Sequence, residues 1–384
     1  MILTKMEKIA KVPYLIAVFI MLTNASCKRN TGTECLRKAE VVMVNGESGY
    51  SSSELTDSIS FLMLEEDANS SFTSVSKLRI ADDRIILFDK MGRNALLAFD
   101  LNGNFITSYG KKGNAGNEYA RLWDFDTDAD YVYLYDWISK KMLYYDHSGK
   151  FVKMRKTTFR GEGFVPTEDG GFLFSLAKDD DNRKLCKVDS SLNIKECLLS
   201  YKEDESDDKV TDNLFQPAGG NIIYNKPVCD SIYIYSPSGE CTECYRMDFD
   251  GENVPSAIRG SYERLLEEGG KKKYAFMYDC PMIANGVLLA TVNHQGYKAT
   301  LLYDLDEKRG SITDWKEGVR LSDIILPVYS CKDYIVGWMD YEVYGILADK
   351  ERFSEEMVRH LEDGGRILVF YHLRNDSNGI GHGK

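Results

Sequence analysis

The chain has 384 residues and carries a formal net charge of −12 at neutral pH. We expect no nucleic-acid partner, because phosphate binding requires a clustered basic surface and the longest basic run here is three lysines, 271–273. With 24 Tyr and 17 Phe but only 8 Pro, and with its apolar residues in short alternating stretches, the composition favours β-structure.

The first residues have the layout of an export signal. Three lysines precede an apolar run from Val12 to Leu22, which is shorter than the ~20 residues that a helix needs to cross a bilayer. This pattern predicts a signal peptide over residues 1–26 that is cleaved from the mature chain.

Ala25-Ser26-Cys27 resembles the lipobox of bacterial lipoproteins, in which the cysteine becomes the lipidated first residue of the mature protein. The resemblance implies that Cys27 is lipidated and that its acyl chains hold the protein on a membrane surface of the cell envelope. The alternative is an ordinary secretory signal with an incidental cysteine. Lys28 and Arg29 follow instead of the acidic residues of surface-export signals, which favours the outer membrane and a position facing the periplasm.

A repeated unit of two strands follows in the first part of the mature chain. Each strand is rich in β-branched and aromatic residues and closes on Asp, and a turn glycine follows the pair. The turn glycines, Gly103 and Gly149, are 46 residues apart. The strand pairs are 84–89 with 95–100, and 131–136 with 141–146.

Fainter copies of the unit bring the total to six, although length divided by period would permit seven. A four-stranded sheet cannot bury both faces alone, so such units stack in a ring. We predict an all-β fold, a six-bladed β-propeller with four-stranded antiparallel blades and short helical insertions, over residues 57–375. Residues 27–56 are expected to be a tether and 376–384 a disordered tail. The fainter copies are 170–174 with 185–189, 231–235 with 244–248, 286–290 with 300–304, and 334–338 with 366–371.

Three segments carry a resemblance to a known family: the Gly-rich loop 109–119, the strand 230–233 and the closing segment 355–371. They are similar to those of the six-bladed β-propeller lipoproteins of Gram-negative bacteria, which are distantly similar to NHL-repeat and TolB-like propellers. The resemblance extends from about Ser58 to Arg374 and implies the architecture, but it names no activity.

Ring closure and two helices are also predicted. The strand 59–64 is expected to join the C-terminal blade, since an open sheet edge is a template for aggregation. Residues 354–361 are the best helix candidate, with Ser354 as N-cap and two acidic residues in the first turn. A second short helix is expected from Tyr262 to Glu268, before two glycines.

Eight cysteines remain after Cys27, and an exported chain can oxidise them. Cys186 and Cys197 flank a turn-like segment and could face each other across a hairpin, while the remaining connectivity stays open. Cys241 and Cys244 have the spacing of half a zinc site or a redox motif. Because their segment has the pattern of a strand rather than a helix N-terminus, we expect neither role.

The motifs of common catalytic and metal sites are missing. The five histidines are scattered, with no HExxH, nucleophile elbow or phosphate loop, so we expect no metal and no cofactor. Asp124, Asp126, Asp128 and Asp130 resemble calcium ligands in composition but lack the spacing of an EF-hand. We interpret them as residues of inter-blade turns.

A binding surface on a propeller is expected on loops at the mouth of its channel. Our candidate ligand-binding residues are Glu118, Tyr119, Arg121 and Trp123, because a carboxylate, a guanidinium and two aromatic rings suit a sugar or a peptide. The alternative is that this loop only packs one blade on the next.

Two classes of function stay open. The first is a non-catalytic ligand-binding or protein-interaction module of the cell envelope, with nutrient uptake as one setting and an envelope protein as a partner. The second is a propeller hydrolase or lyase acting on carbohydrate or peptide. The fold alone does not choose between them.

Overall fold

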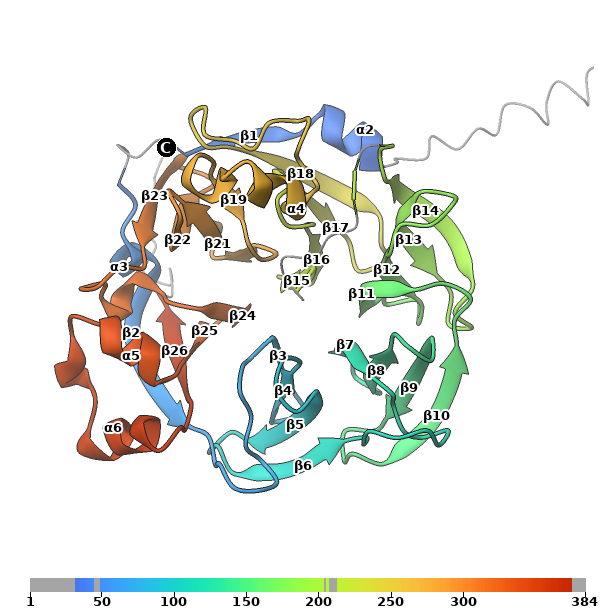
Figure 1. Ribbon diagram of the computed structural model, residues 1–384, viewed down its shortest axis with the longest axis horizontal. Helices are drawn as coiled ribbons and strands as arrows, with labels where there is room; N and C mark the ends of the chain where they lie inside the picture. Colours follow the sequence, from blue (N-terminus) through green and yellow to red (C-terminus); the bar gives the residue numbers. More distant parts are fainter. Residues whose placement is uncertain (1–31, 45–48, 204, 207–212, 375–384) are drawn as a thin grey trace, which may run out of the picture.

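The computed structural model describes residues 32–44, 49–203, 205–206 and 213–374. Six antiparallel sheets stand in a ring around a common axis (Figure 1), so the prediction of an all-β, six-bladed propeller is confirmed. The predicted signal peptide, Cys27 and the predicted tail lie outside the described residues.

In blades one to three, the strands follow one another from the axis to the rim (Figure 1). Blade one holds β3 (Lys77–Ala81), β4 (Arg84–Asp89), β5 (Ala95–Asp100) and β6 (Phe105–Tyr109). Blade two holds β7 (Leu122–Thr127), β8 (Val132–Asp136), β9 (Lys141–Tyr145) and β10 (Phe151–Lys156). Blade three holds β11 (Gly161–Pro166), β12 (Phe172–Leu176), β13 (Arg183–Val188) and β14 (Ile194–Ser200).

The second half of the ring is less regular. Blade four holds β15 (Phe215–Ala218), β16 (Asn221–Tyr224), β17 (Ser231–Tyr235) and β18 (Cys241–Asp248). Blade five holds β19 (Phe276–Met277), β20 (Met282–Ala284), β21 (Val287–His294), β22 (Tyr297–Asp304) and β23 (Arg309–Asp314). Blade six holds β24 (Pro327–Ser330), β25 (Tyr334–Met339), β26 (Ile367–Leu373) and, from the start of the ring, β2 (Thr56–Met63).

The Asp that closes each repeated strand caps the turn that follows. The carboxylate of Asp100 accepts hydrogen bonds from the backbone N–H groups of Asn102 and Asn104. Gly103 has a φ of +86°, and a Cβ there would lie 2.2 Å from the carbonyl oxygen of Met63. Only glycine fits this left-handed position against a neighbouring backbone, which explains the periodic Asp and Gly of the repeat.

The ring closes through strands from opposite ends of the chain. β2 pairs antiparallel with β26, with Ile59 opposite Tyr371 and Met63 opposite Ile367. The predicted joining of the early strand to the C-terminal blade is therefore confirmed. Closure gives β26 a partner on both sides and so removes a sheet edge that would otherwise stay open.

Aromatic side chains fill the space between blades two and three. Phe174 is fully buried, and its ring centroid lies 5.3 Å from that of Phe164 and 5.6 Å from that of Tyr135. The core is thus a set of layers between sheets rather than a single centre, as expected when each blade buries its faces on its neighbours.

Four buried charges join the innermost strands of the first two blades. Lys77 Nζ lies 3.0 Å from Asp124 Oδ1 and 3.0 Å from Asp126 Oδ2, and Arg79 binds Asp126 through two nitrogens at 3.1 and 3.0 Å. The interpretation of Asp124 and Asp126 as turn residues is wrong, because both lie on β7 at the axis. Because β7 carries these charged residues, it lacks the alternation of apolar residues from which a strand is predicted. Asp128 does lie in the turn after β7.

The pKa values of the two buried carboxyl groups shift in opposite directions. Burial raises the pKa of Asp124, and the attraction of Lys77 only partly offsets the shift. Burial also acts on Asp126, but Arg79 and Lys77 outweigh it and hold the pKa of that carboxyl below its usual range. The two cations therefore keep at least one buried carboxylate ionised at the axis.

The helices lie outside the sheets (Figure 1). They are α2 (Gly32–Arg37), α3 (Ser52–Leu55), α4 (Tyr262–Glu267), α5 (Tyr341–Ile346) and α6 (Glu355–Glu362). Both predicted helices are confirmed as α4 and α6, and the Ser354 side chain caps α6 by accepting from Met357 N at 3.2 Å. Among the described residues, no helix is long and apolar enough to cross a bilayer.

The segment predicted to be a tether contributes to the ring. β1 (Glu40–Met43) pairs with β18 in parallel and makes blade four a five-stranded sheet. In Figure 1, α2 and β1 follow the outer edge of this blade.

Candidate functional site

The predicted ligand-binding loop connects blade one to blade two. Tyr119 is buried, and its hydroxyl donates to the carbonyl oxygen of Asn94 at 3.0 Å. Glu118 accepts from the backbone N–H of Ala115 at 2.9 Å and pairs with Lys111 at 3.1 Å. These hydrogen bonds, first that from Ala115, lower the pKa of Glu118. Both side chains hold the loop in shape.

Trp123 and Arg121 lie together just beyond this loop. The guanidinium of Arg121 is 5.5 Å from the ring centroid of Trp123. The same ring is stacked on Trp137, with centroids 5.2 Å apart, and the ammonium of Lys90 is 3.8 Å from its centre. Much of the aromatic surface that a sugar would use already contacts side chains of this chain. A ligand role for Glu118, Tyr119, Arg121 and Trp123 stays a prediction.

A larger hollow lies between blades three and four. Its volume is about 750 Å³, compared with about 570 Å³ for the hollow at the axis that Arg79 and Asp126 line. The walls come from β13, β14, β16, β17 and β18, from the segments after β14 and β16, and from Leu36 of α2. The volume is within the range of small-molecule sites. We call it the blade 3–4 cavity.

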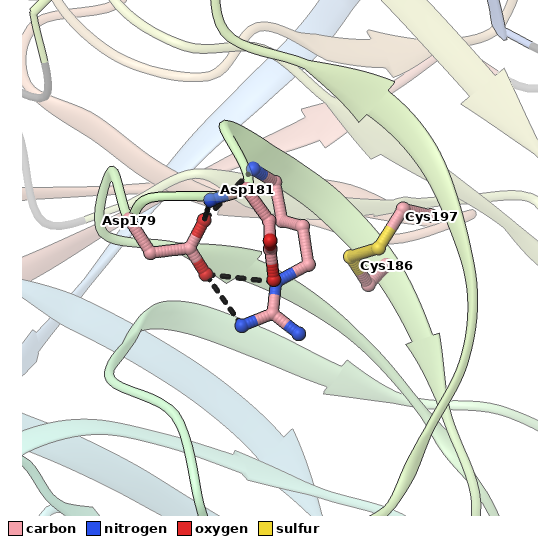
Figure 2. Close-up of a disulfide and its surroundings, with 5 residues drawn as sticks. Asp179, Asp181, Cys186 and Cys197 are labelled. Carbon is pink, nitrogen blue, oxygen red and sulfur yellow. Dashed lines mark hydrogen bonds and ion pairs between the residues drawn. A yellow bond between two sulfur atoms is a disulfide. The ribbon is translucent and has the colours of Figure 1, made fainter.

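A disulfide stabilises one wall of the cavity. Cys186 on β13 and Cys197 on β14 are opposite residues and are bonded, as Figure 2 shows. The predicted pairing across this hairpin is therefore confirmed. Beside it, the carboxylate of Asp179 binds the Arg183 guanidinium at 2.6 Å (Figure 2). The hairpin presents Lys184 and Cys197 to the cavity.

Buried charges sit next to the cavity. The side chains of Lys226 and Glu162 are 3 % and 4 % exposed, with Nζ and Oε2 3.5 Å apart. Lys226 donates to the hydroxyl of Tyr201 at 2.7 Å, and this hydroxyl donates to the carbonyl oxygen of Leu176 at 2.7 Å. Burial lowers the pKa of Lys226, and Glu162 partly counters that shift. Such groups are costly to bury unless partners satisfy them.

A second pair extends this network toward the opening. Lys184 pairs with Glu205, and its ammonium is 5.5 Å from the ring centre of Tyr201. Burial lowers the pKa of Lys184, but Cys229 and Glu205 outweigh it, so that the pKa is raised. Burial raises the pKa of the Cys229 thiol, which is therefore a weak nucleophile at neutral pH.

The rim of the cavity is basic. Arg259 pairs with Asp230 at 2.6 Å. Arg246 on β18 and Lys202 after β14 are exposed, and neither has a side-chain ion pair to another described residue. Counted over the described residues and together with the buried groups, five basic and three acidic side chains belong to the site. A net positive site on a chain of charge −12 is suited to an anionic ligand.

Sequence reasoning missed this cavity because its residues come from two blades and from the N-terminal segment that carries Leu36. No short motif joins Lys184, Tyr201, Lys226 and Arg246, and they converge only when blades three and four pack together. Neither Lys184, which follows a charged stretch, nor Lys226, which lies between Asn225 and Pro227, stands out in the sequence. Among the described residues, no group of three or more His, Cys, Asp or Glu could hold a metal ion.

The model of a family described as "Domain of unknown function (DUF4934)" matches residues 40–370. The chain belongs to this family. A search of curated proteins finds no match. Among solved structures, a Bacteroides fragilis protein designated as exported is 21 % identical, with a TM-score of 0.72 over 87 % of this chain and 100 % of that protein. At this identity the likeness shows the fold alone.

More distant structures share less of the geometry. A member of the DUF4221 family from Bacteroides vulgatus is 10 % identical over 84 % of this chain and 98 % of its own, with a TM-score of 0.49. An inactive virginiamycin B lyase from Staphylococcus aureus is 13 % identical over 72 % and 82 %, with a TM-score of 0.41. Neither carries weight for the function of the DUF4934 chain.

Proposed function

We propose that this DUF4934 protein is a lipid-anchored protein of the cell envelope that binds a carboxylate-bearing ligand in the blade 3–4 cavity. The main supporting observation is that Arg246 and Lys202 line the cavity and are exposed, and that neither forms an ion pair with a side chain in the part of the chain that the structure describes. Cations that are not neutralised by the protein's own side chains are available to a ligand carboxylate. Because burial raises the pKa of the Cys229 thiol, this group is a poor nucleophile for covalent catalysis in the cavity.

The ligand class is tested by calorimetry on the chain that starts at residue 27. The probes are an oligogalacturonate and its methyl-esterified form, and an acidic peptide and its amidated form. We expect one acidic probe to bind and its neutral form not to bind, with affinity falling as salt rises. Equal binding of acidic and neutral forms, or no binding, would contradict the proposal. Shortening of a probe would instead favour the hydrolase or lyase.

The site within the molecule is tested by Arg246→Gln. We expect a loss of affinity of about 10- to 150-fold for the acidic probe, since a hydrogen bond between charged groups contributes about 1.5–3 kcal/mol. Lys156→Gln, an exposed cation on the outer strand of blade two, is the matched control and should bind as the parent does. If Arg121→Gln weakens binding and Arg246→Gln does not, the loop beside Trp123 is the site.

Lipid attachment is tested by labelling. In a Gram-negative host fed a radiolabelled fatty acid, the parent protein should take up label and sediment with membranes. Cys27→Ser should lose all label, while Cys35→Ser, which changes the next cysteine, should keep it. An unlabelled parent, or a labelled Cys27→Ser variant, would show that the N-terminus is an ordinary secretory signal.

A further inference from the structure

Three cysteines meet where the N-terminal segment crosses the outside of blade four. Cys241 and Cys244 lie on β18 and are 4 % and 6 % exposed, and Cys35 on α2 is half-buried. All three belong to one apolar cluster, together with Leu36 and Ala39 of the same N-terminal segment. α2 packs on β18 and on β14.

The strand register explains why these residues converge. β1 is parallel to β18, with Glu40 opposite Tyr245 and Met43 opposite Asp248. In a parallel pair, the residues that precede one partner lie beside the residues that precede the other. The helix before Glu40 therefore lies beside the part of β18 that carries Cys241 and Cys244.

Cys241 has the closer relation to Cys35. Burial is the largest cause that raises the pKa of the Cys241 thiol, and a side-chain hydrogen bond with Cys35 is the second. The pKa of the Cys244 thiol is raised first by burial, and Cys35 contributes to that shift only through its charge. Although the three cysteines share a cluster, the described residues include no group of three or more His, Cys, Asp or Glu side chains that could hold a metal ion.

We propose that Cys35 and Cys241 form a disulfide that fastens the N-terminal segment to blade four. As the S–S bond forms, the two thiols lose two protons and two electrons. An acceptor disulfide, such as oxidised glutathione or the disulfide of a thiol oxidase, takes the electrons and is released as two thiols. The half-buried Cys35 makes the mixed disulfide first, and Cys241 then displaces the acceptor.

The bond would have a consequence for the cavity. Leu36, the neighbour of Cys35, lines the blade 3–4 cavity. Oxidation would therefore hold one wall of that cavity and fix the point where the chain leaves the propeller toward Cys27. The setting in an oxidising compartment rests on the proposed export of the protein.

The test is oxidation of the purified chain that starts at residue 27 in a buffer of oxidised and reduced glutathione. Free thiols are then alkylated in denaturant, and the chain is cleaved by trypsin and by a protease specific for Glu. Cleavage after Glu240 and Glu243 separates Cys241 from Cys244, so that mass spectrometry identifies the partner. We expect a linked Cys35–Cys241 peptide and the loss of two alkylated thiols relative to the reduced chain, beyond the Cys186–Cys197 pair.

Two variants decide the assignment. Cys241→Ser should abolish the link to Cys35, and Cys244→Ser, three residues away on the same strand, should keep it. The proposal is overturned if Cys35 stays alkylated in the oxidised parent while Cys186 and Cys197 are linked, or if Cys244 proves to be the partner. Because the buffer supplies the oxidant, the outcome is independent of export, which the lipid-labelling experiment reports separately.

Discussion

Asp126→Ala is expected to lower the free energy of unfolding by about 3–5 kcal/mol, the usual cost of breaking a buried ion pair from one side. Asp126 accepts two hydrogen bonds from the Arg79 guanidinium and forms an ion pair with Lys77 at the axis. Without it, the buried Arg79 guanidinium would lose its carboxylate partner. Urea denaturation with linear extrapolation measures the change.

Two further variants separate this effect from the loss of any acidic residue. Asp130→Ala, on the exposed turn after the same strand, should change stability by no more than about 0.5 kcal/mol. The double variant Arg79→Met with Asp126→Leu should recover part of the loss, because no charge stays buried alone. A cost of Asp126→Ala below about 1 kcal/mol would contradict the assigned role of the network.

Phe174→Ala is expected to cost about 3–5 kcal/mol, as for other fully buried aromatic residues. The ring fills the layer between blades two and three, against Phe164 and Tyr135. Removal of the phenyl ring leaves a cavity that the two sheets cannot close. Each sheet is held in place by its own hydrogen bonds and by the closed propeller. The same denaturation experiment reports the loss.

Val152→Ala provides the comparison for this second variant. Val152 lies on β10 and is 45 % exposed, so its truncation should cost less than about 1 kcal/mol. If Phe174→Ala were as mild as Val152→Ala, stacking of blades two and three would not be a main source of stability.

Much of the propeller could be read from local patterns. A near-constant interval separates the strands of alternating apolar residues, each followed by an Asp and a turn glycine. The interval recurs because each blade is built from the same strands and turns. The hairpin register brought Cys186 opposite Cys197, which a short turn largely determines. Ser354 marked the start of α6 for an equally local reason, since an N-cap bonds only to the next turn.

The exceptions arose where partners are distant. Asp124 and Asp126 were misassigned to turns because their partners, Lys77 and Arg79, lie in another blade. In blade four, the strand pair expected from the repeat proved to be the third and fourth strands rather than the second and third. Charged residues on inner strands and loops of unequal length interrupt the sequence period from which the strands were predicted.

The amino-acid sequence by itself determined the class of fold and the strand that closes the ring, because both follow from periodic burial along the chain. Six repeated units were visible in the sequence, but the chain length also permitted seven, and the structure decided for six. Only the tertiary structure decided where charges and cavities lie. The ion pairs at the axis, the blade 3–4 cavity and the meeting of Cys35 with Cys241 all join residues from different segments. Contacts of this kind form only when the blades pack together, so no short sequence pattern predicts them.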